Sequence, residues 1–81
     1  MDQLHFVTVA EPCGNFNVKV RFDTGETGMF NCEYLTVDPY WERLRDDTFF
    51  STARAEYGTI VWDDNIDVAP ESVWERSKIL K

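Results

Sequence analysis

Three aspartates lie close together in the last third of the chain and are its densest group of oxygen ligands: Asp63, Asp64 and Asp67. Clustered carboxylates are the ligands that divalent cations such as Ca²⁺ prefer. The spacing Asp-Asp-Asn-Ile-Asp lacks the alternating ligands, the central glycine and the distal glutamate of an EF-hand loop. We therefore interpret residues 63–65 as a solvated turn and predict no metal site.

Other residue types that catalysis uses are scattered along the chain. His5 is the single histidine, and no nucleophile motif surrounds it. Cys13 lacks the neighbouring positive charge or helix start that lowers the pKa of a reactive thiol. With Cys32 it makes up the whole cysteine content, so we predict two reduced thiols, although strand pairing that brings them together stays an alternative. We expect a protein that is not an enzyme and has no cofactor.

Length and charge restrict the class of protein further. The 81 residues, 43% of them hydrophobic, predict a single folded domain over residues 1–81. No apolar run approaches the roughly 20 residues of a membrane span, and no secretory signal begins the chain, so we expect a cytoplasmic protein. The net charge of −7 opposes direct binding to nucleic acid and favours basic protein partners.

The negative charge is concentrated between Arg54 and Arg76, an interval without basic residues. Its carboxylates are the candidate binding residues: Glu56, Asp63, Asp64, Asp67, Glu71 and Glu75. If the turn and the last helix lie at one edge of the domain, the electric field there is negative and attracts a basic partner. The alternative is a solvated acidic face that binds nothing.

The stretch from Gly58 to Trp74 contains the elements that must position these carboxylates. A glycine followed by the β-branched and aromatic run Thr-Ile-Val-Trp predicts a strand over residues 59–62, paired in a hairpin with an extended segment over residues 51–57. Pro70 at the first helical position, with Val68 and Val73 as a hydrophobic staple, predicts a C-terminal helix in which Arg76, Lys78 and Lys81 complement the negative end.

The first half of the chain predicts a three-strand meander over residues 4–10, 16–22 and 27–32, with turns at residues 11–15 and 23–26. Polar and apolar side chains alternate without a break along the second strand. Gly25 suits the left-handed backbone position of a tight hairpin. Asp38 before Pro39 predicts a helix start, with Trp41 and Leu44 on its inner face. The whole is an α+β fold: a small antiparallel sheet of a meander plus a two-strand hairpin, a helical middle segment and a C-terminal helix.

Several of these segments together resemble a known family, domain of unknown function 2442, over residues 6–77. The resemblance rests on VKVRFDTGETGMF, LRDDTFF and GTIVW, and above all on IDVAPESVWERS. The structural motif of the family falls on Gly58, Trp62, Pro70 and Trp74, together with Asp67 and Glu71. Members more often have tyrosine at the position of Trp74 and aspartate at that of Asn31, and some carry an added helix-turn-helix that this sequence lacks.

The resemblance implies a small α+β domain with an antiparallel sheet and supplies no catalytic residues. It also implies small bacterial and phage-associated proteins, often encoded beside another small protein, in which this domain takes the antitoxin-like place. We therefore expect a non-enzymatic protein-binding module, antitoxin-like, that holds a small basic partner, such as the neighbouring gene product, through the acidic face. Self-association into a homo-oligomer remains an open possibility.

Two further hypotheses remain. An acidic DNA mimic would occupy the basic groove of a nucleic-acid-binding protein, as phage inhibitors do, and the charge fits that role equally well. A DNA-associated regulator would need its cations to line up as one basic stripe: Lys19, Arg21, Arg43, Arg45 and Arg54.

Overall fold

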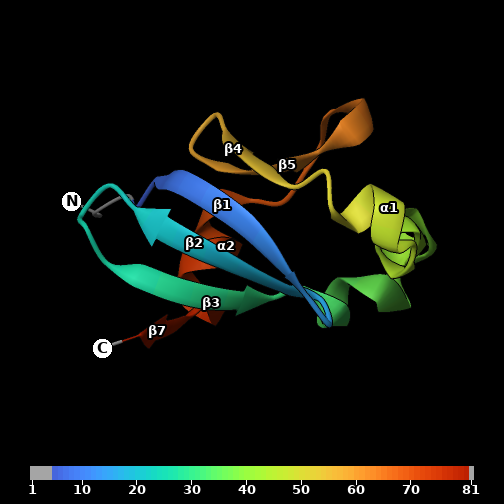
Figure 1. Cartoon of the computed structure of the whole chain (residues 1–81), viewed down its shortest axis with the longest axis horizontal. Coiled ribbons are helices and arrows are strands. Elements are labelled where there is room, and N and C mark those ends of the chain that lie inside the picture. The colour runs from blue at the N-terminus through green and yellow to red at the C-terminus, as the bar shows by residue number, and fades with distance from the viewer. Residues whose placement is uncertain (1–4, 81) are drawn as a thin grey trace.

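Two antiparallel sheets form the framework of the computed structural model, which describes residues 5–80 (Figure 1). The first sheet has the strand order β1-β2-β3-β7, with β1 Val7–Gly14, β2 Asn17–Phe22, β3 Thr27–Asn31 and β7 Lys78–Leu80. The second has the order β4-β5-β6, with β4 Arg54–Glu56, β5 Thr59–Trp62 and β6 Ile66–Asp67. Antiparallel sheets with a few short helices confirm the predicted α+β class.

The alternation of β2 determines which face of the first sheet is buried. Val18, Val20 and Phe22 are buried, whereas Lys19 and Arg21 between them are exposed. At the end of β2 the Phe22 N–H donates to the Glu26 carbonyl (2.8 Å), and the Gly25 N–H donates to the Phe22 carbonyl (2.8 Å). Gly25 has a φ of +94°, which confirms the tight hairpin with a left-handed glycine.

The first strand extends further along the sequence than the pattern predicts. It begins at Val7, later than predicted, because His5 and Phe6 lie outside the strand, and it continues through the predicted turn to Gly14. Leu4, the predicted first residue, lies outside the described residues. Asn15 and Phe16 alone reverse the chain, with φ of 54° and 65°, a left-handed pair whose twist matches that of the flanking strands. Pro12 is tolerated because β1 is an edge strand of its sheet and its pairing shifts register after Pro12.

The middle segment consists of three short helices at one end of the sheets (Figure 1). They are the 3₁₀ helices η1 Glu33–Val37 and η2 Pro39–Arg45, and the helix α1 Asp47–Phe50. Asp38 caps η2 as predicted, because its Oδ1 accepts a hydrogen bond from the Tyr40 N–H (2.9 Å). Leu44 is buried in the core and Trp41 is half-buried, so the predicted inner face is confirmed, although this helix is 3₁₀ rather than α.

The predicted two-strand hairpin has a third strand in the structure. Asp63–Asn65 form the 3₁₀ helix η3, in which Asp64 and Asn65 have positive φ, and the chain folds back so that β6 pairs with β5. β5 therefore lies between two strands and all four of its residues are buried. The sequence did not indicate β6, because two residues are too few to show a period.

The helix α2 Pro70–Arg76 packs behind the first sheet in Figure 1 and begins at Pro70, as predicted. Val68 and Val73 are both buried in the core, as expected of a hydrophobic staple. The helix ends before Ser77, however, and the chain continues as β7, which pairs with β3. Lys78 therefore lies in a strand instead of a helix end. Gly28 permits this approach, because a Cβ there would lie 3.1 Å from the Ser77 Cβ.

Candidate protein-binding surface

The six carboxylates of the predicted acidic face come from four elements. Glu56 belongs to β4, Asp63 and Asp64 to η3, Asp67 to β6, and Glu71 and Glu75 to α2. All except the half-buried Glu56 are exposed. The fold brings cations from outside the acidic interval to some of these side chains, so the six differ in how much charge they offer a partner.

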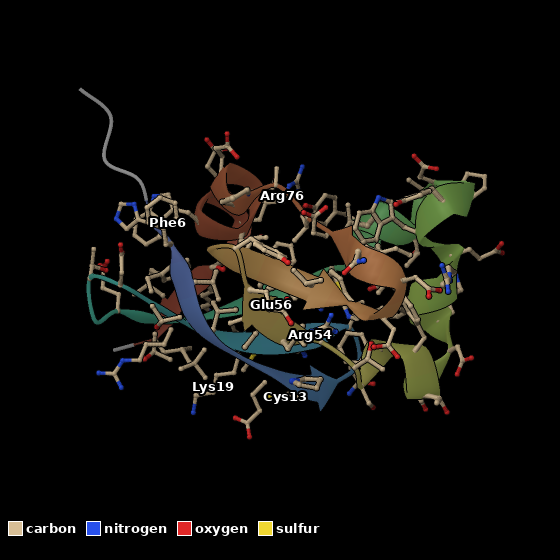
Figure 2. All side chains as sticks on the ribbon, turned by 90° about the horizontal axis from the view of Figure 1, so that it is seen from above. Phe6, Cys13, Lys19, Arg54, Glu56 and Arg76 are labelled. Atoms are coloured by element: carbon tan, nitrogen blue, oxygen red, sulfur yellow. The ribbon has the colours of Figure 1, made fainter. Side chains whose placement is uncertain are left out.

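Arg54 engages two of the six carboxylates. Its Nε donates to the Glu56 carboxylate, and its Nη1 lies 3.5 Å from Asp63 Oδ1. Figure 2 shows Arg54 and Glu56 side by side on the second sheet. The hydrogen bond with Glu56 is the main cause that raises the pKa of the Arg54 guanidinium. Much of the local negative charge is therefore balanced within the fold.

Asp64 is also paired. Its Oδ2 accepts a hydrogen bond of 2.5 Å from Arg43 Nη2 of η2, and the same guanidinium lies 4.5 Å from the centre of the Phe49 ring. Both partners are largely exposed, and exposed pairs contribute less than about 1 kcal/mol to stability. Their importance here is electrostatic, because three of the six candidate carboxylates already have a cation nearby.

The other three carboxylates form what we call the acidic ridge: Asp67, Glu71 and Glu75. Within residues 5–80, no Lys, Arg or His nitrogen lies within 4.0 Å of any of them. Glu71 and Glu75 are four residues apart and so project from the same side of α2. Arg76 is directed elsewhere, because its guanidinium lies 3.8 Å from the centre of the Tyr34 ring. The acidic ridge therefore keeps its charge available.

Four aromatic residues connect α2 with the Tyr57–Gly58 turn, in what we call the aromatic corner: His5, Phe6, Tyr57 and Trp74. The His5 ring stacks on Trp74, with 3.5 Å between ring centroids, and Trp74 meets Phe22 edge to face at 5.0 Å. The Tyr57 side chain is 81% exposed and that of Phe6 41%. Exposed rings of this kind favour protein contacts.

The fold links the aromatic corner to the acidic ridge. The Val7 N–H donates to the Gly58 carbonyl (2.9 Å), which brings Phe6 to the Tyr57–Gly58 turn. Thr59 Oγ1 donates to the Val68 carbonyl (2.6 Å), so the chain leaves the second sheet beside the same turn and enters α2. The sequence analysis missed Phe6 and Tyr57, because nothing in a local pattern shows that two distant segments meet.

The structural motif residues belong to this same region. Gly58 has a φ of +77°, and a Cβ at this position would lie 2.5 Å from Phe6 Cδ1. Trp62 is completely buried in the core, Pro70 begins α2, and Trp74 is partly buried beneath His5. These residues therefore hold the turn, the core and the helix together rather than presenting reactive groups.

The two thiols are free and lie in different environments. Cys13 is exposed, and its Sγ donates to the Glu11 carbonyl (3.4 Å). Cys32 is buried, and this burial raises the pKa of its thiol to about 12. In the described part of the chain, no cluster of three His, Cys, Asp or Glu residues suits a metal ion, and no helix is long and apolar enough to cross a membrane.

The cations proposed for a DNA-binding stripe lie in separate places. Arg43 and Arg54 contact carboxylates of η3 and β4, and Arg45 donates to Thr36 Oγ1 (3.0 Å). Lys19 and Arg21 instead lie on the outer face of the first sheet. In Figure 2, Lys19 projects on the side of the molecule opposite Arg76.

Comparison with known proteins identifies the family of the chain. No curated protein and no solved structure matches it. The sequence model of the family described as "Protein of unknown function (DUF2442)" matches residues 7–78, which is nearly the whole chain. The matched region includes the strands β1 to β6, the helix α2, all six candidate carboxylates and, of the aromatic corner, Tyr57 and Trp74. The chain therefore belongs to the DUF2442 family.

Proposed function

We propose that this chain is a cytoplasmic, non-enzymatic protein-binding module, antitoxin-like, that holds a small basic partner through the acidic ridge and the aromatic corner. The observation that supports this proposal best is the pair Glu71 and Glu75. Both are exposed on one side of α2, and among residues 5–80 no cation lies within 4.0 Å of either carboxylate. Trp74 of the same helix stacks on His5, and the exposed Phe6 that follows His5 lies at the Tyr57–Gly58 turn. Unpaired charge and exposed aromatic residues are thus both connected to α2.

Such a combination matches the physics of protein recognition. Large, rigid aromatic side chains supply most of the binding energy at many interfaces because they bury much apolar area at little entropic cost. Carboxylates at the rim add less affinity, but they speed encounter with a basic partner and make binding sensitive to salt. We therefore expect the aromatic corner to determine how tightly the partner is held and the acidic ridge to determine which partner arrives.

Because of these ion pairs, Glu71 and Glu75 are better candidates for binding a partner than Asp63 and Asp64 are. Asp63 and Asp64 are consecutive in the sequence, yet each lies within 4.0 Å of an arginine. A substitution there disturbs contacts between η3 and its neighbours as well as any partner. Glu71 and Glu75 report on binding more cleanly, since their side chains form no ion pair within residues 5–80.

The proposal is tested with the tagged chain in native lysate, washed at low and then at high salt, with bound proteins identified by mass. We expect a small basic protein at equal stoichiometry that is released by salt. The variant Glu71→Lys with Glu75→Lys should weaken the purified complex about tenfold or more, since each lost contact at a charged interface typically costs on the order of 1 kcal/mol.

A matched control separates position from net charge. Glu33→Lys with Glu42→Lys changes the net charge by the same amount at exposed positions of η1 and η2, and it should leave binding nearly unchanged. Equal weakening by both variants would show that only overall charge matters and would contradict the proposed surface. A captured nucleic-acid enzyme whose nucleic acid is displaced by the chain would point instead to DNA mimicry.

A further inference from the structure

We propose that the outer face of the first sheet is a second binding site, which takes a short acidic segment of a protein partner. This face is opposite in charge to the acidic ridge and lies on another side of the molecule. It contains a shallow groove of about 240 Å³ lined by Val9, Glu11, Lys19, Val20, Arg21 and Thr27. The proposal goes beyond the proposed function, because it concerns other residues and a partner of opposite charge.

Strand register determines what this face presents. β2 alternates, so Lys19 and Arg21 point away from the core that Val18, Val20 and Phe22 enter. Across the sheet, Arg21 lies between Val9 of β1 and Thr27 of β3, and Lys19 lies between Glu11 and Met29. Lys78 of β7 pairs with Met29 and therefore extends the cross-strand row that contains Lys19. Two cations thus stand at the centre of the face, with a third toward its edge.

The two central cations are not engaged by the fold. Among residues 5–80, no carboxylate oxygen lies within 4.0 Å of the Lys19 or Arg21 side-chain nitrogens. Glu11 is the cross-strand neighbour of Lys19, yet these two side chains form no ion pair. Arg43 and Arg54, by contrast, both contact carboxylates. In a protein of net charge −7, two unengaged cations side by side are a distinct feature.

The geometry fits an extended acidic segment. Lys19 and Arg21 are two residues apart on one strand, so their Cα atoms are separated by roughly 6.5 Å, and alternate side chains of an extended peptide have the same spacing. Two carboxylates at positions i and i+2 therefore match the two cations. Val9 is 52% exposed and Met29 is half-buried, so the face also offers apolar contact beside the charges.

A nucleic acid fits this face less well. Its phosphates continue along the strand at every nucleotide, so a bound strand extends beyond two or three cations and meets the repulsion of a protein with excess negative charge. A short acidic segment brings only the few charges that the groove can neutralise. Glu11, at the edge of the groove, disfavours a longer polyanion for the same reason.

The probe for the experiment is a synthetic peptide in which glutamate alternates with valine, about eight residues long so that it covers the length of β2. It is titrated at low salt into the ¹⁵N-labelled chain. We expect the largest shifts at the amides of Val9, Lys19 and Arg21. Shifts concentrated on α2, or no shifts at all, would overturn the proposal.

Three variants test the role of charge. Lys19→Gln with Arg21→Gln should weaken peptide binding at least tenfold, whereas Lys19→Arg with Arg21→Lys should retain it. Ser51→Asp with Asn65→Asp lowers the net charge by the same amount as the first variant, at exposed positions outside the groove, and should bind nearly as the parent does.

The amide spectrum of each variant shows whether it is folded. Val9→Ser, which keeps both cations, should weaken peptide binding less than the double variant does. Unchanged affinity after Lys19→Gln with Arg21→Gln would overturn the site. Tighter binding of a single-stranded oligonucleotide at the same amides would overturn the acidic segment as occupant. Failure here leaves the acidic ridge untouched, because Glu71 and Glu75 are unaltered in all these variants.

Discussion

The strands β2 and β5 show two different uses of a strand in this small domain. Along β2, every second side chain is buried and the others face solvent. Along β5, all four side chains are buried, because β4 and β6 flank it and the core and α2 cover it. β2 therefore offers a free face for binding, while β5 has none to offer. The difference separates a strand with an exposed face, which we propose for binding, from a strand whose side chains all belong to the interior.

The arginines follow the same division. Arg54 lies on β4, next to β5, and contacts Glu56 and Asp63. Arg21 lies on the outer face of β2 and contacts no carboxylate within the described residues. The two arginines thus differ in their contacts: Arg54 forms ion pairs within the fold, whereas Arg21 forms none within the described residues. Three variants test whether β5 and its surroundings stabilise the fold while the outer face of β2 contributes little to stability.

The largest expected effect is at Trp62, the last residue of β5. Its side chain is 0% exposed and contacts Trp41 edge to face, with 5.7 Å between ring centroids. Trp62→Ala should lower the free energy of unfolding by about 3–5 kcal/mol, because it removes a large buried side chain and leaves a cavity. Urea denaturation measures this loss. Tyr57→Ala, at an exposed ring, should change stability by less than about 0.5 kcal/mol, and equal losses would contradict the assignment.

A smaller effect is expected at Gly58, the second residue of the Tyr57–Gly58 turn and the last residue before β5. Gly58→Ala must place a Cβ at a φ of +77°, which costs roughly 1–2 kcal/mol, and must also displace the Phe6 ring. Gly25→Ala has only the backbone cost of a Cβ at positive φ, since nothing lies within 4 Å of its Cβ position. We therefore expect Gly58→Ala to be the more destabilising of the two in thermal unfolding.

A double variant isolates the contact with Phe6. Phe6→Ala removes the ring that the new Cβ would meet, so Gly58→Ala should cost less in that background than in the parent chain. Additive losses would show that the turn accommodates the methyl group without moving Phe6. The close approach of Gly58 to the aromatic corner would then have no consequence for stability.

Much of this division was predictable from sequence where a local pattern is complete. The alternation around Lys19 and Arg21 gave the exposed face of β2, and the run after Gly58 gave β5 with its bounds. The cap at Asp38 and the helix start at Pro70 follow from the intrinsic preferences of single residues. These features depend on neighbours in the chain, so the sequence contains all that is needed.

Features that depend on distant contacts were not predictable in the same way. β6 and β7 are strands only because β5 and β3 offer edges to pair with, and Gly28 makes the space for Ser77. The pairing of Asp64 with Arg43 crosses from η3 to η2, so a count of charges along the sequence overstated the acidic face. The aromatic corner likewise needs the N-terminal segment to reach the Gly58 turn.

The smallest expected effect distinguishes the two arginines. Arg54→Gln should lower the free energy of unfolding slightly at low salt, because its ion pairs are partly exposed, and the loss should shrink as salt screens them. Arg21→Gln should change stability by only a few tenths of a kcal/mol at any salt concentration. Denaturant titrations of both variants at two salt concentrations measure the difference. A salt-dependent loss at Arg21 equal to that at Arg54 would mean that the fold already uses the Arg21 charge, and the outer face of β2 would then have one cation fewer to offer an acidic segment.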